Sequence, residues 1–149
     1  MSAFIILLVE DDPDDVFFLQ DAFAKLGRAG DLRVARDGEE AVAYLSGEGA
    51  FADHALNPPP SLILLDLKLP RKSGLEVLEW RREKAGLSRI PVIVLTSSQS
   101  QDDMARAYDL GANSYLVKPI NSQAQKKMVH ALCQFWIDLN QVPEIGSAP

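Results

Sequence analysis

Residues 4–12 read FIILLVEDD, an unbroken apolar run that ends abruptly in three carboxylates. An apolar run without alternation is typical of a strand buried on both faces, as in a parallel sheet covered by helices on each side. Pro13 then suits the first turn of a helix. This stretch predicts a buried strand whose C-terminal end presents acidic side chains.

The rest of the chain repeats this alternation of short apolar runs and helical patterns. The expected strands are 4–9, 32–35, 61–65, 91–95 and 114–117, and the expected helices are 13–26, 40–45, 74–84, 102–111 and 121–141. Five strands alternating with five helices predict an α/β fold with a doubly wound, five-stranded parallel sheet. Residues 47–60 hold two glycines and three consecutive prolines, so we expect a long loop there. We expect one domain over residues 1–143 and a flexible tail over residues 144–149.

The bulk composition limits the classes of function. The chain has 149 residues, a net charge of -6, 47% hydrophobic and 24% charged residues, as in an ordinary soluble domain. Such an acidic chain lacks the basic surface that nucleic acid needs, so we expect no nucleic-acid partner. The single cysteine, Cys133, excludes an internal disulfide and fits a reducing, cytoplasmic setting. The first apolar run is too short to cross a membrane and lacks the basic flank of a signal peptide.

Polar side chains follow four of the expected strands. They are Glu10-Asp11, Asp66, Thr96 and Lys118. Because the carboxyl ends of parallel strands meet at one edge, these side chains should converge. Three carboxylates need a cation, and hard oxygen ligands suit Mg²⁺. A lysine and a threonine beside that cation suit a phosphoryl group, so we expect Asp66 to be phosphorylated. The step from Lys118 to Pro119 suits a turn with a cis peptide bond.

Each of these residues has a plainer interpretation when taken alone. The acidic run favours a helix N-terminus, and Asp14 and Asp15 fit a solvated helix entry. Asp66 could form a turn, Thr96 could cap a helix, and Lys118 could extend its ammonium to solvent. Adjacent carboxylates at the end of a buried strand are costly without a cation, which favours the functional interpretation.

Together these stretches resemble the receiver domain of two-component response regulators. The matching stretches are 8–11, 64–70 with Gly74, 94–97, 111–112 and 115–119. No single motif is specific, but their combination in this order is. The resemblance spans about residues 4–140 and implies a flavodoxin-like fold.

The resemblance implies a role for each matching residue. Asp66 would accept a phosphoryl group from the phosphohistidine of a histidine kinase, and Lys118 would contact the carboxylate and then the phosphoryl group. Thr96 and Tyr115 would be the switch residues. The ligands implied for Mg²⁺, with Mn²⁺ or Ca²⁺ as substitutes, are Glu10, Asp11, Asp66 and the backbone carbonyl of Lys68. This lysine departs from the commoner uncharged residue, which bears on the lifetime of the phosphoryl group.

Three further features resemble the stand-alone regulators that partner phytochrome kinases. They are the loop before Ser61, the run 69–72 and the aromatic pair Phe135-Trp136. We therefore expect a bacterial phytochrome as the kinase partner and an output through protein–protein contact. The helix that begins at Asn121 carries two adjacent apolar stripes. Either the helix covers more core than usual, or Phe135 and Trp136 form a homodimer interface. We predict a homodimer through this helix.

Three other functions fit part of the pattern. A Mg²⁺-dependent phosphatase with Asp66 as nucleophile, similar to haloacid-dehalogenase enzymes, would need an aspartate where Lys68 stands. A dinucleotide-binding domain would need a glycine-rich turn where residues 10–13 stand. An unphosphorylated scaffold would not need the site residues at all. His54 and His130 belong to no motif, and we expect both at the surface.

Overall fold

The computed structural model describes residues 4–143 and contains one sheet of five parallel strands in the order β2-β1-β3-β4-β5. The strands are β1 (Ile6–Val9), β2 (Leu32–Ala35), β3 (Leu62–Leu65), β4 (Val92–Thr96) and β5 (Ser114–Val117). The helices are α1 (Pro13–Lys25), α2 (Gly38–Ser46), α3 (Gly74–Arg82), α4 (Gln101–Asp109) and α5 (Ser122–Cys133). The predicted doubly wound sheet is confirmed, and its strand order is the flavodoxin-like one rather than that of a dinucleotide-binding domain.

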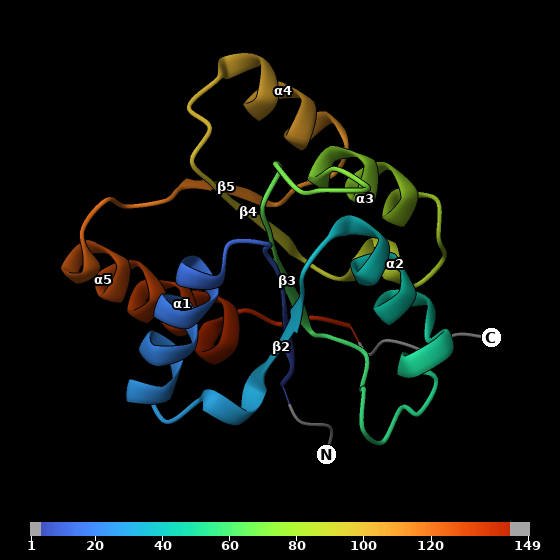
Figure 1. Cartoon of the computed structure of the whole chain (residues 1–149), viewed down its shortest axis with the longest axis horizontal. Coiled ribbons are helices and arrows are strands. Elements are labelled where there is room, and N and C mark those ends of the chain that lie inside the picture. The colour runs from blue at the N-terminus through green and yellow to red at the C-terminus, as the bar shows by residue number, and fades with distance from the viewer. Residues whose placement is uncertain (1–3, 144–149) are drawn as a thin grey trace.

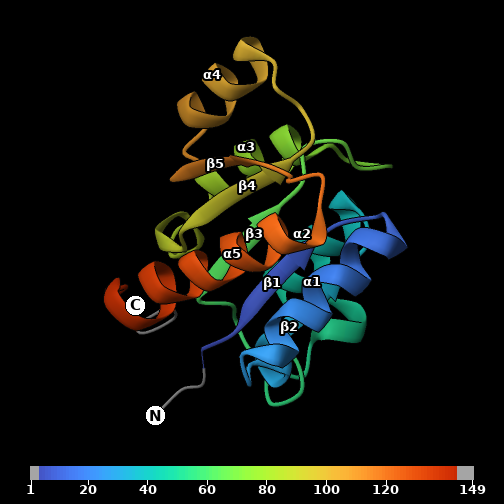
Figure 2. The same cartoon turned by 90° about the vertical axis from the view of Figure 1, so that its left-hand side faces the viewer.

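Helices cover both faces of the sheet, as Figures 1 and 2 show. On β1, Leu7 and Val9 face the layer formed by α2, α3 and α4, whereas Ile6 and Leu8 face α1 and α5. All four side chains are at most 1% exposed. Burial on both faces explains why the strand sequence is continuously apolar instead of alternating.

A polar side chain caps the N-terminus of every main helix. Each cap accepts a hydrogen bond from a backbone N–H two or three residues further on; the caps are Asp12, Asp37, Ser73, Ser100 and Asn121. Such caps fix where a helix begins. The second helix consequently begins at Gly38, two residues before the expected start, because Asp37 caps it instead of forming only a turn.

The last helix differs from the single α-helix that the sequence predicts. Its α-helical part ends at Cys133, and Gln134–Leu139 continue as a π-helix, labelled η4. The wider turns change which side chains face the protein, since a π-helix bonds residue i to i+5 rather than i+4. The π-helix ends at Leu139, and the backbone amide of the next residue, Asn140, donates to the carbonyl of Phe135 at 2.7 Å.

The expected loop at residues 47–60 contains a short 3₁₀ helix, Gly49–Phe51, and is tied to the domain. The hydroxyl of Tyr44 donates to the carbonyl of Pro58 at 2.8 Å, and its ring lies 5.1 Å from that of Phe51. His54 and His130 are exposed, as expected. Within residues 4–143, no helix is long and apolar enough to cross a membrane. The tail predicted at 144–149 lies outside the described residues.

Gly74 brings the start of α3 against the end of β3. A Cβ at this position would collide with the backbone carbonyl of Asp66 and lie 2.7 Å from the Cα of Leu67. We expect Gly74→Ala to lower the free energy of unfolding by about 2–4 kcal/mol, because backbone atoms must shift. The matched control is Gly30→Ala, which meets nothing within 4 Å and should have little effect. Equal urea midpoints for the two variants would contradict this account.

Candidate functional site

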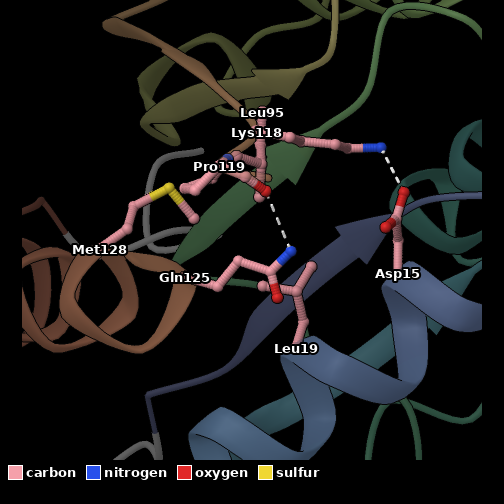
Figure 3. A pocket seen from close by; sticks show the side chains of 7 residues that line it. All are labelled: Asp15, Leu19, Leu95, Lys118, Pro119, Gln125 and Met128. Carbon is pink, nitrogen blue, oxygen red and sulfur yellow. Dashed lines mark hydrogen bonds and ion pairs between the residues drawn. The ribbon is translucent and has the colours of Figure 1, made fainter. Parts of the chain in front are cut away.

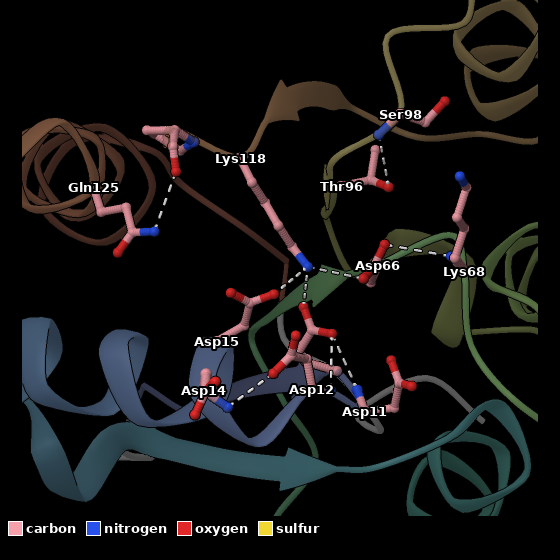
Figure 4. A network of polar contacts seen from close by, with 12 residues as sticks. Asp11, Asp12, Asp14, Asp15, Asp66, Lys68, Thr96, Ser98, Lys118 and Gln125 are labelled. Atoms are coloured by element: carbon pink, nitrogen blue, oxygen red, sulfur yellow. Dashed lines mark hydrogen bonds and ion pairs between the residues drawn. The ribbon is translucent and has the colours of Figure 1, made fainter. Parts of the chain in front are cut away.

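The carboxyl edge of the sheet gathers the acidic residues that the sequence places at strand ends. Carboxylate oxygens of Glu10, Asp11 and Asp66 lie within 4.8 Å of one another. Glu10 and Asp66 are 1% and 6% exposed, whereas Asp11 is exposed to solvent. The cluster therefore combines two buried carboxylates with one that solvent reaches; Figure 4 shows Asp11 and Asp66 on neighbouring strand ends.

Backbone amides orient two of these carboxylates. One oxygen of Glu10 accepts hydrogen bonds from the amides of Asp11 and Asp12, at 3.1 and 3.2 Å. One oxygen of Asp66 accepts a longer bond from the amide of Lys68, at 3.3 Å. The side chain of Lys68 is exposed, so this residue contacts the site through its backbone amide.

Lys118 carries the cation that balances this cluster. Its ammonium contacts carboxylate oxygens of three residues, at 2.5 Å from Glu10, 2.8 Å from Asp15 and 2.9 Å from Asp66. Its amide donates to the carbonyl of Thr96 at 2.8 Å, which extends the pairing of β4 and β5 by one bond. An ammonium has three N–H donors, so each can serve one carboxylate.

The prediction of a cis bond between Lys118 and Pro119 is wrong. No peptide bond in the described part of the chain is cis. The trans bond is the usual form before proline. The long lysine side chain spans the distance from β5 to the acidic cluster without a special turn.

Burial and neighbouring charges shift the pKa values of Glu10 and Lys118. Burial raises the pKa of Glu10 from 4.5 to about 7, a rise that the hydrogen bond from Lys118 opposes and the charge of Asp66 increases. Burial alone would lower the pKa of Lys118, but its hydrogen bonds to Asp15, Glu10 and Asp66 raise the pKa above its ordinary value. The lysine is therefore fully charged at neutral pH, and the cluster retains an excess of negative charge.

The two expected switch residues lie on neighbouring strands and meet through a third residue. Thr96 is fully buried at the end of β4, and its hydroxyl accepts a bond from the amide of Ser98 at 3.4 Å. The hydroxyl of Tyr115 donates to the carbonyl of Ser98 at 3.0 Å. In turn, the hydroxyl of Ser98 donates to Asp103 in the first turn of α4, at 2.6 Å.

Sequence reasoning missed two residues of this network. Asp15 does not belong to a solvated helix entry, because its carboxylate contacts Lys118. Its spacing of four residues from the buried Leu19 places it on the inward face of α1, and this periodicity was the available signal. Ser98 left no comparable signal, since a serine after a strand is ordinary in loops.

The donor set fits a hard divalent cation. Three carboxylates from two adjacent strand ends offer oxygen ligands within 4.8 Å of one another. Oxygen ligands of this kind suit Mg²⁺, which usually keeps several waters as well. The structure thus defines a flavodoxin-like domain with a cluster of carboxylates, one of them a buried aspartate, that suits a divalent cation.

The chain belongs to the response regulator receiver domain family. The family model with that description matches residues 6–130. Members of this family are phosphoacceptors that bind a divalent metal, and the acidic cluster described above occupies the expected edge of the sheet.

Two relatives resemble nearly the whole chain. The response regulator Rcp1 of Synechocystis is 40% identical over 139 residues, which cover 93% of this chain and 92% of Rcp1. The probable methanogenesis regulatory protein FilR2 of Methanothrix harundinacea is 40% identical over 143 residues, covering 94% and 88%.

Solved structures of such regulators share the fold. The phosphorylated cyanobacterial phytochrome response regulator RcpA superposes with a TM-score of 0.89 at 38% identity, covering 96% of this chain and all of RcpA. The Mn²⁺-bound form of Rcp1 gives a TM-score of 0.84 at 39% identity, covering 95% and 100%. The resemblance to phytochrome-associated regulators is confirmed.

The raised pKa of Glu10 has a consequence for stability. A carboxylate whose pKa is higher in the folded than in the unfolded state favours folding most at low pH, and this stabilisation is lost as pH rises through the folded pKa. Glu10→Gln should therefore raise the free energy of unfolding at pH 8 by roughly 1–3 kcal/mol and change it little at pH 4, below the ordinary pKa of 4.5.

Urea unfolding in the presence of chelator measures this difference. Glu79→Gln is the control, since Glu79 is exposed on α3 and far from the cluster in sequence. The same gain from Glu10→Gln at both pH values would show that the burial of its charge is not the cause.

Proposed function

We propose that this protein is a response regulator that accepts a phosphoryl group on Asp66 from a sensor histidine kinase and signals through protein–protein contact. The observation that carries the proposal is the position of Asp66. This aspartate is 6% exposed at the end of a central strand, beside the carboxylates of Glu10 and Asp11 and 2.9 Å from the Lys118 ammonium. A carboxylate there is oriented for attack and surrounded by groups that stabilise added negative charge.

The reaction has a simple balance. A carboxylate oxygen of Asp66 attacks the phosphorus of a phosphohistidine, the bond from nitrogen to phosphorus breaks, and the imidazole leaves with the electron pair. An acyl phosphate remains on Asp66. Lys118, 2.9 Å from the carboxylate, is placed to turn to a phosphoryl oxygen.

The proposed cation is Mg²⁺, with Mn²⁺ or Ca²⁺ as substitutes. Glu10, Asp11 and Asp66 would hold it, together with the backbone carbonyl of Lys68. When bound, it would neutralise phosphoryl oxygens during transfer. Support comes from the close carboxylate set and from the relative Rcp1, which has a Mn²⁺-bound form.

The switch is proposed to run through Thr96 and Tyr115. A phosphoryl group on Asp66 would attract the Thr96 hydroxyl, which now accepts from the amide of Ser98. Because Ser98 also holds Tyr115 and the start of α4, a shift at Thr96 would reach the surface of α4. Phosphorylation would thus bias a two-state surface by a local change of charge.

The kinase partner is proposed to be a bacterial phytochrome acting in the cytoplasm. The similarity to RcpA and Rcp1 over the whole described domain supports this assignment. FilR2, a probable methanogenesis regulatory protein, is equally similar, so sequence similarity alone does not select a phytochrome as the kinase. Phosphotransfer from a purified phytochrome kinase to this protein, compared with transfer from an unrelated kinase, tests the partner directly.

The phosphatase alternative has less support. An aspartyl-nucleophile phosphatase would place a general acid two residues after Asp66, where the Lys68 side chain instead points to solvent. A scaffold without phosphorylation would leave the pairing of Lys118 with a buried aspartate unexplained. Multiple turnover of small phosphate esters would favour the phosphatase.

Exposure to acetyl phosphate and Mg²⁺ should add one phosphoryl group to the wild-type protein. Asp66→Asn should add none, because the amide is not a nucleophile, and chelator should abolish labelling of the wild type. Intact mass spectrometry measures the gain. Labelling of Asp66→Asn to the wild-type level would place the acceptor elsewhere and overturn the proposal.

A homodimer through the last helix is also proposed. Phe135 is 50% and Leu139 is 70% exposed, and the ring of Phe135 packs edge-on against Trp136 at 5.0 Å. Trp136 itself packs partly against the core of its own domain. Phe135 is therefore the better anchor for a second copy, and a two-fold arrangement is the default.

Phe135→Glu should shift the protein from dimer to monomer, because a carboxylate would have to be buried in the interface. Sedimentation equilibrium over a range of concentrations measures the mass, and Gln134→Glu adds the same charge to the same helix as a control. A wild type that is monomeric at all concentrations tested, or a Phe135→Glu variant that stays dimeric, would rule this interface out.

A further inference from the structure

Asp15 is the one partner of Lys118 that lies outside the carboxylate set suited to a cation. It projects from the first turn of α1 and contacts the ammonium at 2.8 Å, while its side chain is 27% exposed. The set of close carboxylates in the described chain contains Glu10, Asp11 and Asp66 but not Asp15. The lysine therefore has two partners that a cation would engage and one that it would not.

Contacts at both ends of Lys118 fix its position. Its stem runs past Leu95 toward Asp15, between β4 and α1, as Figure 3 shows. The backbone next to Lys118 is held to α5, because the side-chain amide of Gln125 donates to the carbonyl of Pro119 at 3.2 Å. Asp15 completes this arrangement by holding the charged tip to α1.

A cation would change what the other two partners of Lys118 can offer. Carboxylates of Glu10 and Asp66 that coordinate a divalent ion share their charge with it, and the ion repels the ammonium. A partly buried ammonium without a partner is costly. A carboxylate that the ion does not use would keep the lysine paired and in place.

We propose that Asp15 is a positioning residue, which holds the Lys118 ammonium when Glu10 and Asp66 turn to the cation and so favours both metal binding and phosphoryl transfer. This inference rests on the proposed cation site and on the proposed role of Asp66 as acceptor. Asp15 does not touch the transferred group; it acts through Lys118. Its removal should therefore matter only while the lysine is present.

Calorimetric titration of the metal-free protein with Mn²⁺ tests this dependence. Asp15→Asn should weaken Mn²⁺ binding by about 5- to 20-fold, and in a Lys118→Met background the same substitution should weaken it by no more than about 2-fold, as expected for directly coupled residues. Asp15→Glu, which keeps a carboxylate on the same helix face, should recover most of the affinity.

Asp14→Asn is the matched control, since it removes the same charge from the neighbouring, exposed position. It should change Mn²⁺ binding by less than about 2-fold in either background, because a solvated charge is screened. Urea unfolding of each variant verifies that it folds. Equal effects of Asp15→Asn with and without Lys118, or equal effects of Asp14→Asn and Asp15→Asn, would overturn the proposal.

Labelling by acetyl phosphate separates this inference from the proposed function. Asp15→Asn should slow labelling of Asp66 by about 3- to 10-fold at saturating metal, if the lysine is mispositioned. Wild-type protein that binds Mn²⁺ with the expected coupling but is never labelled would overturn the acceptor role and leave the metal coupling standing. Wild-type protein that is labelled no faster than Asp15→Asn at saturating metal would overturn the positioning role in transfer alone.

Discussion

The contact of one ammonium with three carboxylates is the interaction on which the site depends. Lys118 lies within 2.9 Å of oxygens from Glu10, Asp15 and Asp66, and two of these acids are almost fully buried. Buried carboxylates that share one ammonium lie close together, and they repel one another strongly because the protein interior screens charge poorly. In this structure the Lys118 ammonium supplies the positive charge that offsets this repulsion.

This constraint explains much of the surrounding architecture. The lysine must come from a strand beyond the one that carries Asp66, and parallel pairing of β3 with β4 and β4 with β5 places it there. Close approach of α3 to β3 requires Gly74, and the start of α1 must bring Asp15 inward. Each of these features helps to build the same charged cluster, although each arises from a different part of the sequence.

The same edge of the sheet also connects the site to the surface. Thr96 carries the backbone bond to Lys118, and Ser98 two residues later holds both Tyr115 and the first turn of α4. A change of charge at Asp66 would therefore act on a group of short, mutually dependent hydrogen bonds rather than on a single contact. Away from this edge, the π-helix Gln134–Leu139 is held to the loop after α1 by the ion pair of Arg28 with Asp138 at 2.9 Å. Phe135 in this π-helix is exposed.

Much of this was determined by the sequence alone. Continuous apolar runs such as Ile6–Val9 required a sheet buried on both faces, and polar residues at the ends of such runs had to meet, because parallel strands share one carboxyl edge. Only the tertiary structure decided the finer pairing. The set of carboxylates that contact Lys118, including Asp15, depends on contacts between residues far apart in the chain. Asp15 and Lys118, for example, are 103 positions apart. The widening of the last helix into a π-helix likewise depends on packing that local sequence does not specify. Local sequence patterns predict strands and helices from the spacing of their apolar residues. They do not predict which of several neighbours a long side chain contacts, because that depends on how the helices and strands pack together.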